Sequence, residues 1–291
     1  MQRMKVRPLT ASDVADAQNL AMAAFTDLDE RTHQAPEPVT PERIQRGRLR
    51  IAHLLETDPA GVFVAEDDGE VVGVALALRR EDMWGLSLLT VAPHRQSSGI
   101  GRLLLDEALA YGEGCRGWMI LSSDDRRALR RYARAGFTLL PAAHASGPVR
   151  NKLKPEGKVR QGSLKDTATC AAASRHVRGA AHTLDLPAFL AIGATLLVCD
   201  DERGVGFAIS REANPFLLAA TDERVATDLL RATLALAKDG ADVEVEAITH
   251  AQPWAVDVLL DAGLRLRISG AVFVKGDVGP LAPYLPSGPY L

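Results

Sequence analysis

The sequence lacks the cysteine and histidine patterns of metal and redox proteins. Its 291 residues include only three cysteines, Cys115, Cys170 and Cys199, whose spacing matches neither a zinc site nor a redox pair. We expect them to be small buried thiols in a reducing compartment. The seven histidines form neither an HExxH motif nor a pair at ligand spacing, so no metal site is predicted.

Long apolar runs are also missing. The longest one, residues 188–199, is shorter than the roughly 20 residues that cross a bilayer. Residues 1–7 lack the apolar segment of a secretory signal. We therefore expect a cytoplasmic protein with no membrane partner.

A strong charge of either sign is absent. The 34 Lys and Arg residues nearly balance the 37 Asp and Glu residues, and the net charge is −3. Such a chain has no long-range field suited to a polyphosphate backbone. Nucleic acid is therefore not an expected partner.

What the sequence does contain is an internal repeat. Residues 7–13 correspond to 160–166, residues 70–75 to 203–208, and residues 128–137 to 255–264. The chain is also about twice the length of a typical domain. We predict a first domain at 1–145, a linker rich in Pro, Gly and basic residues at 146–158, and a second domain at 159–291.

Each half shows strand and helix patterns in an order typical of an α/β (α+β) fold. In the first half the β-rich runs are 6–8, 61–65, 71–78, 86–91, 118–121 and 137–140, and the helical patterns are 40–56, 99–111, 125–135 and a segment capped by Thr10. Asp67, Asp68 and Gly69 are typical of a hairpin turn. Gly136 is expected to end the fourth helix.

A glycine-containing segment between a strand and a helix is the main candidate for chemistry. In this position backbone N–H groups and the helix dipole point at one anion. Glycines let the backbone approach phosphate oxygens, and serine hydroxyls add donors. We predict a pyrophosphate cradle made by Gln96, Ser97, Ser98, Gly99, Ile100, Gly101 and Arg102.

The order of a strand, the basic Arg95, Gln-x-x-Gly-x-Gly and an apolar helix resembles the acetyl-CoA motif of the GNAT superfamily. Residues 124–137, which contain Tyr132, Gly136 and Phe137, resemble the family's second segment, Asn-x-x-Ala-x-x-x-Tyr-x-x-x-Gly-Phe. The resemblance covers about residues 4–140 strongly and 159–275 weakly. It implies two tandem GNAT-like domains, each a mixed, mostly antiparallel sheet flanked by helices.

The resemblance also implies roles for individual residues. The strand segment Leu89, Thr90 and Val91 would hold the pantetheine arm of acetyl-CoA, and the cradle would bind its pyrophosphate. Tyr132 would donate a proton to the departing thiolate. Asp125 stands where the family has a cofactor-binding Asn, and an ionised carboxylate can only accept hydrogen bonds.

The general base that must deprotonate the amine is not evident. Family members often carry a Glu on the strand before the phosphate loop, and Ser87 occupies that strand here. His94, Glu66 and the α-carboxylate of Leu291 are the candidates, with a water chain as the other route.

The predicted fourth helix carries a stripe of arginines at three- and four-residue spacings. These residues are Arg127, Arg130, Arg131 and Arg134. They could meet the 3′-phosphate of CoA, or form a solvated face paired with Asp124 and Asp125.

The second half has lost these features. No glycine remains in its matching segment, residues 221–227, and Leu259 replaces Tyr132. We predict that it binds no acetyl-CoA, and that it covers the acceptor groove or forms a homodimer interface. The function predicted is N-acetyl transfer from acetyl-CoA to a small-molecule or peptide amine, and the alternative is a non-catalytic acyl-CoA sensor. The acceptor, which loops such as 27–41 would select, the acyl-chain preference and the oligomeric state are not specified by any motif.

Overall fold

The computed structural model describes residues 4–32, 36 and 38–291. Two compact units make up the chain: Met1–Arg79 with Trp84–Cys115, and Arg80–Met83 with Arg116–Leu291. Within the described ranges, none of the helices has the length and apolar character of a membrane span. Likewise, no group of three or more His, Cys, Asp or Glu side chains in these ranges is arranged to hold a metal.

The first unit is a four-stranded sheet with helices on both faces. Its strands lie in the order β1-β2-β3-β4, with β1 antiparallel to β2 and β2 antiparallel to β3. The elements are β1 Lys5–Pro8, a 3-10 turn Ala11–Asp13, α1 Val14–Arg31, α2 Pro41–Thr57, β2 Val62–Asp67, β3 Glu70–Arg80, β4 Met83–Val91, a 3-10 turn Pro93–Arg95 and α3 Ile100–Tyr111.

Local signals account for the start of most of these elements. The Thr40 side chain accepts a hydrogen bond from the Arg43 N–H (3.2 Å) and caps α2. The hairpin between β2 and β3 turns through Asp68 and Gly69, whose φ values are +49° and +88°. Positive φ at both central residues is what a two-residue hairpin of this kind requires.

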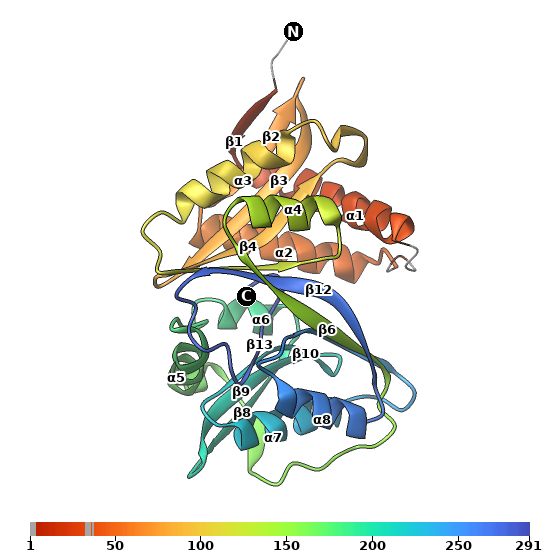
Figure 1. Cartoon of the computed structure of the whole chain (residues 1–291), viewed down its shortest axis with the longest axis vertical. Helices are drawn as coiled ribbons and strands as arrows, with labels where there is room; N and C mark the ends of the chain where they lie inside the picture. Colours follow the sequence, from red (N-terminus) through yellow and green to blue (C-terminus); the bar gives the residue numbers. More distant parts are fainter. Residues whose placement is uncertain (1–3, 33–35, 37) are drawn as a thin grey trace. The chain divides into compact units, whose positions relative to one another are not determined.

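The two faces of this sheet carry different helices. Apolar side chains of α1 and α2 pack with Val62, Val64, Val74 and Leu76 in one core cluster. Residues two apart in a strand share a face, so Ala65 and Gly73 point to the other side. There they meet α3, which crosses in front of the strands in Figure 1.

The second unit contains two sheets. One has the order β5-β12-β6-β11 and the other β13-β10-β9-β8-β7. The elements are β5 Gly117–Ser122, α4 Arg126–Arg134, β6 Thr138–Pro148, β7 Val159–Gln161, a 3-10 turn Leu164–Asp166, α5 Thr167–Arg178, α6 Leu186–Ala191, β8 Thr195–Asp201, β9 Gly204–Arg211, β10 Asn214–Ala220, α7 Glu223–Leu234, β11 Asp242–Ile248, α8 Pro253–Asp261, β12 Arg265–Gly276 and β13 Tyr284–Leu285.

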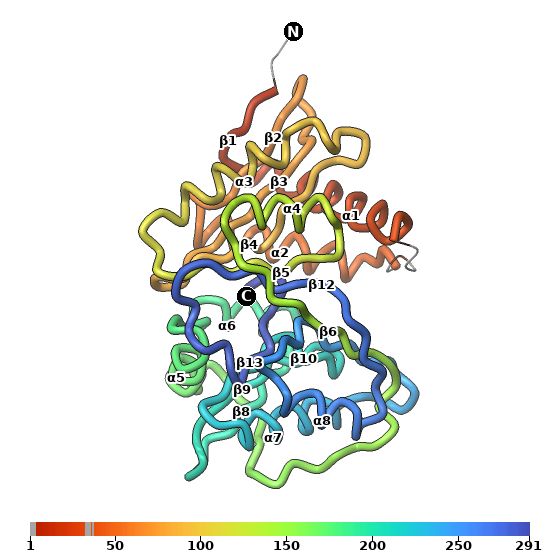
Figure 2. The backbone as a smooth tube through the Cα atoms, in the orientation of Figure 1, coloured from red at the N-terminus to blue at the C-terminus, as the bar shows by residue number. Residues whose placement is uncertain are grey.

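Two long strands join the repeats inside this unit. β6 comes from the first repeat and β12 from the second, and they run side by side in Figure 2. β12 also pairs with β5, and β6 also pairs with β11. Each long strand thus lies between two strands of the other repeat.

This exchange corrects the predicted extent of the strand after α4. The sequence predicted a strand at 137–140 and a linker from residue 146, whereas β6 continues to Pro148. Residues 141–148, which are mainly Ala, Pro and Gly, form a strand because β11 and β12 supply hydrogen-bonding partners on both sides. The domain boundary at residue 145 remains a prediction about the repeats.

The repeated segments adopt the same local structure. Arg7 donates to Asp13 at 2.7 Å, and Arg160 donates to Asp166 at 2.5 Å. In both copies the acid also closes a capping box at the 3-10 turn before the helix.

Candidate active site

The predicted cofactor strand and loop lie together in the first unit. In β4, Leu89 and Val91 are half-buried, and Thr90 lies on the opposite, buried side. The loop that follows is tied back to the strand, because the Gln96 Nε2 donates to the Val91 carbonyl (3.3 Å) and, at 3.5 Å, to Asp27. Arg95 forms an ion pair with Asp67 at the end of β2.

The backbone of this loop has the geometry expected of an anion site. Ser97 and Gly99 have φ values of +66° and +93°, and both are exposed. A non-glycine residue with positive φ is uncommon, and such conformations gather at functional sites. Ser98 Oγ donates to the Arg95 carbonyl (2.6 Å) and holds the turn between them.

Helix α3 begins here without a side-chain cap from any described residue. Its N-cap is Gly99, its first turn carries no acid, and a Cβ at Gly99 would face open space. The carbonyl of Gly99 accepts from the N–H groups of Arg102 and Leu103. The preceding amides of the first turn have no partner within the helix, so they can receive an anion.

Close packing fixes the position of this helix start. A Cβ at Gly73 would lie 2.7 Å from Leu104 Cδ1 and 3.0 Å from Ile100 Cγ2. At the other end of α3, Trp84 Nε1 donates to the Ala108 carbonyl at 2.9 Å. The first turn of α3 is therefore held by β3 and the last turn by β4.

The matching loop of the second repeat is closed. Asp222 caps α7 by accepting from the Arg224 N–H at 2.8 Å. Thr221 Oγ1 accepts from the Val205 N–H at 2.9 Å. A carboxylate thus already occupies the place that an incoming phosphate would take, which supports the prediction that this half binds no acetyl-CoA.

Tyr132 lies in the second unit, on α4. Its side chain is 5% exposed and its ring meets Phe273 edge to face, with centroids 5.4 Å apart. The hydroxyl makes no hydrogen bond to any described residue. Its oxygen is not fully enclosed, so it keeps some contact with solvent. Burial raises the pKa of this phenol above its usual value of 10, so it stays protonated at neutral pH.

Asp125 acts as the N-cap of α4. Its carboxylate accepts from the Arg127 N–H at 2.8 Å and pairs with the Arg127 guanidinium at 2.6 Å. These are the contacts of a structural cap, and its role toward the cofactor remains a prediction. Asp124 instead accepts from the Gly270 N–H at 2.6 Å, in the irregular middle of β12.

The arginines of α4, which are Arg126 and the stripe Arg127, Arg130, Arg131 and Arg134, are only partly neutralised. Arg127 has its partner, whereas no ion pair joins Arg126, Arg130 or Arg134 to another residue in the described ranges. These three are exposed and lie four residues apart, on one face of the helix.

Two of the three candidate bases are already engaged. Glu66 pairs with Arg7 at 2.7 Å and with Lys5 at 3.1 Å, and these hydrogen bonds lower its pKa, which makes it a poor base. The Leu291 oxygen is buried and accepts from the Arg178 guanidinium at 2.5 Å. His94 is exposed in the turn before the cradle.

Two residues of β4, Ser87 and Thr90, have a buried hydroxyl without a hydrogen-bond partner among the described residues, which no sequence motif showed. Ser87 lies on the same side of β4 as Leu89 and Val91, its side chain is 8% exposed, and its Oγ has no hydrogen-bond partner among the described residues. A buried hydroxyl without a partner requires an explanation, and a bound water or substrate atom is one. Only its position on the strand before the loop could have marked it.

Comparison with known proteins assigns the family. The model described as "Acetyltransferase (GNAT) family" matches residues 22–137. An uncharacterized N-acetyltransferase from Mycobacterium tuberculosis is 32% identical over 133 residues, which are 40% of this chain and 85% of that protein, and one from Mycobacterium bovis matches equally well. The chain belongs to the GNAT acetyltransferase family. It is an acetyltransferase enzyme, and acetyl-CoA is its cosubstrate.

Solved structures share the fold of this GNAT protein over nearly its whole length. A putative acetyltransferase from Pyrococcus horikoshii is 19% identical and superposes with a TM-score of 0.79. The alignment covers 99% of this chain and 95% of the other. A tandem GNAT protein from the clavulanic acid biosynthesis pathway is 15% identical, with a TM-score of 0.60 over 94% and 99%. At these identities the likeness concerns the fold, and it agrees with the predicted tandem arrangement.

Proposed function

We propose that this protein transfers an acetyl group directly from acetyl-CoA to the amine of a small molecule or peptide. The observation that carries the proposal is the uncapped start of α3 directly after β4, with left-handed Ser97 and Gly99 in the loop between them. A cytoplasmic location, as the sequence predicted, would give access to acetyl-CoA.

The cradle would bind the pyrophosphate of acetyl-CoA through backbone amides. Each hydrogen bond to a charged group contributes about 1.5–3 kcal/mol, and the helix dipole adds about 0.3–1 kcal/mol. Several such bonds suffice for a stable complex. The half-buried side of β4 that carries Leu89 and Val91 would then take the pantetheine arm.

Tyr132 would stabilise the departing thiolate. Because burial raises its pKa above 10, full proton transfer to a thiolate whose conjugate thiol has a pKa of about 8.5 is uphill by at least about 2 kcal/mol. We therefore assign the phenol to hydrogen-bond donation while the C–S bond breaks, with the proton following as the thiolate leaves.

The amine must lose a proton before or during attack. With Glu66 paired to Arg7 and Lys5, we propose that a water held by the Ser87 hydroxyl accepts this proton and passes it to solvent. At pH 7 an alkylammonium with a pKa of about 10.4 is deprotonated at a cost of roughly 4–5 kcal/mol. We therefore expect the rate to rise with pH until the pH reaches the pKa of the acceptor amine.

The test is calorimetric titration of acetyl-CoA into wild type and into Gly99→Asp/Gly101→Asp. Wild type should bind one acetyl-CoA per chain, and the double variant should bind none. Gly114→Asp is the matched control, because Gly114 is also an exposed, left-handed glycine of the first unit with open space for a Cβ (φ +83°). Two sites per chain would contradict the closed second loop, and equal binding by the double variant would refute the cradle.

An acyl-CoA sensor without turnover is the second candidate. The observation that favours it is that Glu66 is paired with Arg7 and Asp125 with Arg127, so neither carboxylate is a free base. Release of free CoA thiol in the presence of amine panels separates the two functions. Amine-dependent release supports the enzyme, whereas binding without release for every amine class supports the sensor.

A further inference from the structure

Three neighbouring strands of the second unit present an open face with segregated charge. Ser146 of β6 is the register partner of Arg265 in β12 and of Glu244 in β11. Register partners point to the same face of a sheet, so an acid, a hydroxyl and a guanidinium form a row across three strands. The opposite face carries Val243 and Val245, which belong to the core.

The charges on this face are not neutralised within the chain. Asp242 and Glu244 stand two residues apart on β11, and both are exposed. Arg265 on β12 and Arg150 after β6 are exposed as well. No ion pair joins any of these four residues to another described side chain.

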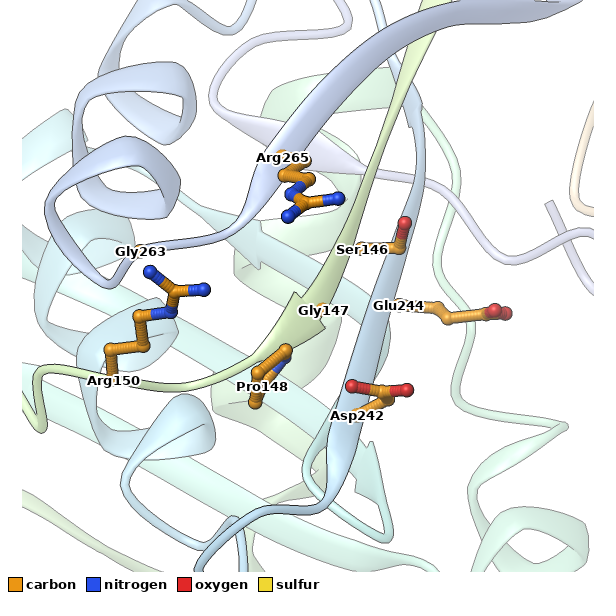
Figure 3. Close-up of a pocket in the computed structure, with 8 residues that line it drawn as sticks. All are labelled: Ser146, Gly147, Pro148, Arg150, Asp242, Glu244, Gly263 and Arg265. Atoms are coloured by element: carbon orange, nitrogen blue, oxygen red, sulfur yellow. The ribbon is translucent and has the colours of Figure 1, made fainter.

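These residues line one pocket of about 350 Å³, a size within the range of small-ligand sites. Figure 3 shows the two arginines on one side of β6 and the two acidic residues on the other. The remaining lining residues are small or compact: Ser146, Gly147, Pro148 and Gly263. The pocket surface between the two arginines and the two acidic residues is therefore formed by small, uncharged residues.

Gly263 holds Arg150 in this position. A Cβ at Gly263 would lie 3.0–3.2 Å from the Cβ, Cγ and Cδ atoms of Arg150, so the stem of the arginine lies directly over the glycine. The Arg150 N–H also donates to the Ala262 carbonyl at 2.9 Å. This arginine is thus anchored at its backbone and stem, and only the guanidinium is free to move.

We propose that this pocket binds a short free peptide of three small residues. Its terminal carboxylate would contact Arg150 and Arg265, and its terminal ammonium would contact Asp242 and Glu244. Adjacent strands are about 4.8 Å apart, so β11 and β12 are roughly 10 Å apart across β6. An extended chain spans about 3.3–3.6 Å per residue, and three residues cover that distance. A single α-amino acid is too short to reach both groups.

The proposal is independent of acetyl transfer and is tested by binding alone. Trialanine would be titrated into the full chain by calorimetry, alongside N-acetyl-trialanine and trialanine amide. Loss of one charge-assisted contact should weaken binding by about tenfold or more, so each capped peptide should bind about tenfold less tightly than trialanine.

Variants assign each end of the peptide. Arg150→Gln combined with Arg265→Gln should reduce the affinity for trialanine to that for the amide, and Asp242→Asn combined with Glu244→Gln should reduce it to that for the N-acetyl peptide. Lys238→Gln, which removes an exposed lysine of the second unit that forms no ion pair with another described residue, is the control and should leave peptide affinity unchanged. Thermal unfolding of each variant confirms that it is folded.

Three outcomes would overturn the proposal. Trialanine that does not bind at millimolar concentration excludes the site. If free and capped peptides bind equally tightly, recognition of the terminal charges by the pocket is excluded. Binding that survives both Arg150→Gln and Arg265→Gln places the peptide elsewhere.

Discussion

Gly73 and Gly206 occupy matching positions in the two repeats, and the same substitution at each is expected to have different effects on acetyl-CoA binding. Carbon atoms pack best at about 3.5–4.0 Å. A methyl group at Gly73 would lie 2.7 Å from Leu104 Cδ1 and 3.0 Å from Ile100 Cγ2. Gly73→Ala should therefore displace the first turn of α3 by about 0.5 Å or more.

The size of the effect on acetyl-CoA affinity follows from the hydrogen bonds that the first turn of α3 would make to phosphate. Overpacking of this kind typically lowers stability by about 1–3 kcal/mol. Because Ile100 begins α3, the same displacement moves the amides of the cradle out of hydrogen-bonding position. The loss of one hydrogen bond to phosphate, about 1.5–3 kcal/mol, should weaken acetyl-CoA binding about 10- to 100-fold.

Gly206→Ala is the matched control. Its methyl group would lie 2.8 Å from both Ala220 Cβ and Leu229 Cδ1 and 2.9 Å from Val225 Cγ1. The stability loss should be similar or larger, but α7 has no ligand to misplace because Asp222 already caps it. Affinity for acetyl-CoA should stay at the wild-type value.

The measurements are thermal unfolding and calorimetric titration of acetyl-CoA for both variants, at a temperature where each is folded. If Gly73→Ala bound acetyl-CoA as tightly as wild type, the packing of β3 against α3 would not position the cradle. If Gly206→Ala weakened binding as much as Gly73→Ala, the assignment of the cofactor to the first repeat alone would be refuted.

Three further predictions concern side chains of the second unit. Tyr132→Phe should leave thermal unfolding and acetyl-CoA affinity unchanged, because the ring keeps its contact with Phe273. In a thiol-release assay it should lower kcat about 10- to 100-fold. An unchanged kcat would show that the hydroxyl has no part in the reaction. The Arg80–Asp185 pair is 2% and 0% exposed and 2.5 Å long, so Asp185→Ala, which strands a buried guanidinium, should lower the free energy of unfolding by about 3–5 kcal/mol in urea titrations; a loss below about 1 kcal/mol would contradict the burial of the pair. Burial and two nearby guanidinium groups lower the pKa of His182 well below 6.5, so the unfolded state binds the proton first and stability should fall as the pH decreases below about 6.5. In urea titrations between pH 7 and 5, His182→Gln should make stability depend less on pH. If the pH dependence of the variant equals that of wild type, another group causes it.

Local structure, including that of the loop proposed as the cradle, could be predicted from the sequence because short-range physics determines it. Thr40 before a proline and an acid starts a helix, and Asp68-Gly69 closes a hairpin, because each satisfies its own backbone within a few residues. In the Gln-Ser-Ser-Gly-Ile-Gly segment, Gly99 readily adopts the positive φ that the start of α3 shows. The loss of the second cradle was also readable, since Asp222 replaces glycine at the same place.

Features that depend on distant segments could not be predicted. Residues 141–148 have no strong strand pattern, and they form a strand because β11 and β12 complete their hydrogen bonds. The pairing of Glu66 with Arg7 joins residues 59 apart in the chain, and it excluded a candidate base that the sequence had left open.

The sequence by itself determined the family and the tandem repeat, and it indicated the segment proposed to bind the cofactor, because these depend on residue types at fixed short spacings. Only the tertiary structure decided that β6 and β12 each pair with strands of the other repeat, that Ser87 is buried without a partner among the described residues, and that acidic and basic residues face one pocket across β6. Those facts depend on strand register, and a shift by a single residue would turn every side chain to the other face of the sheet.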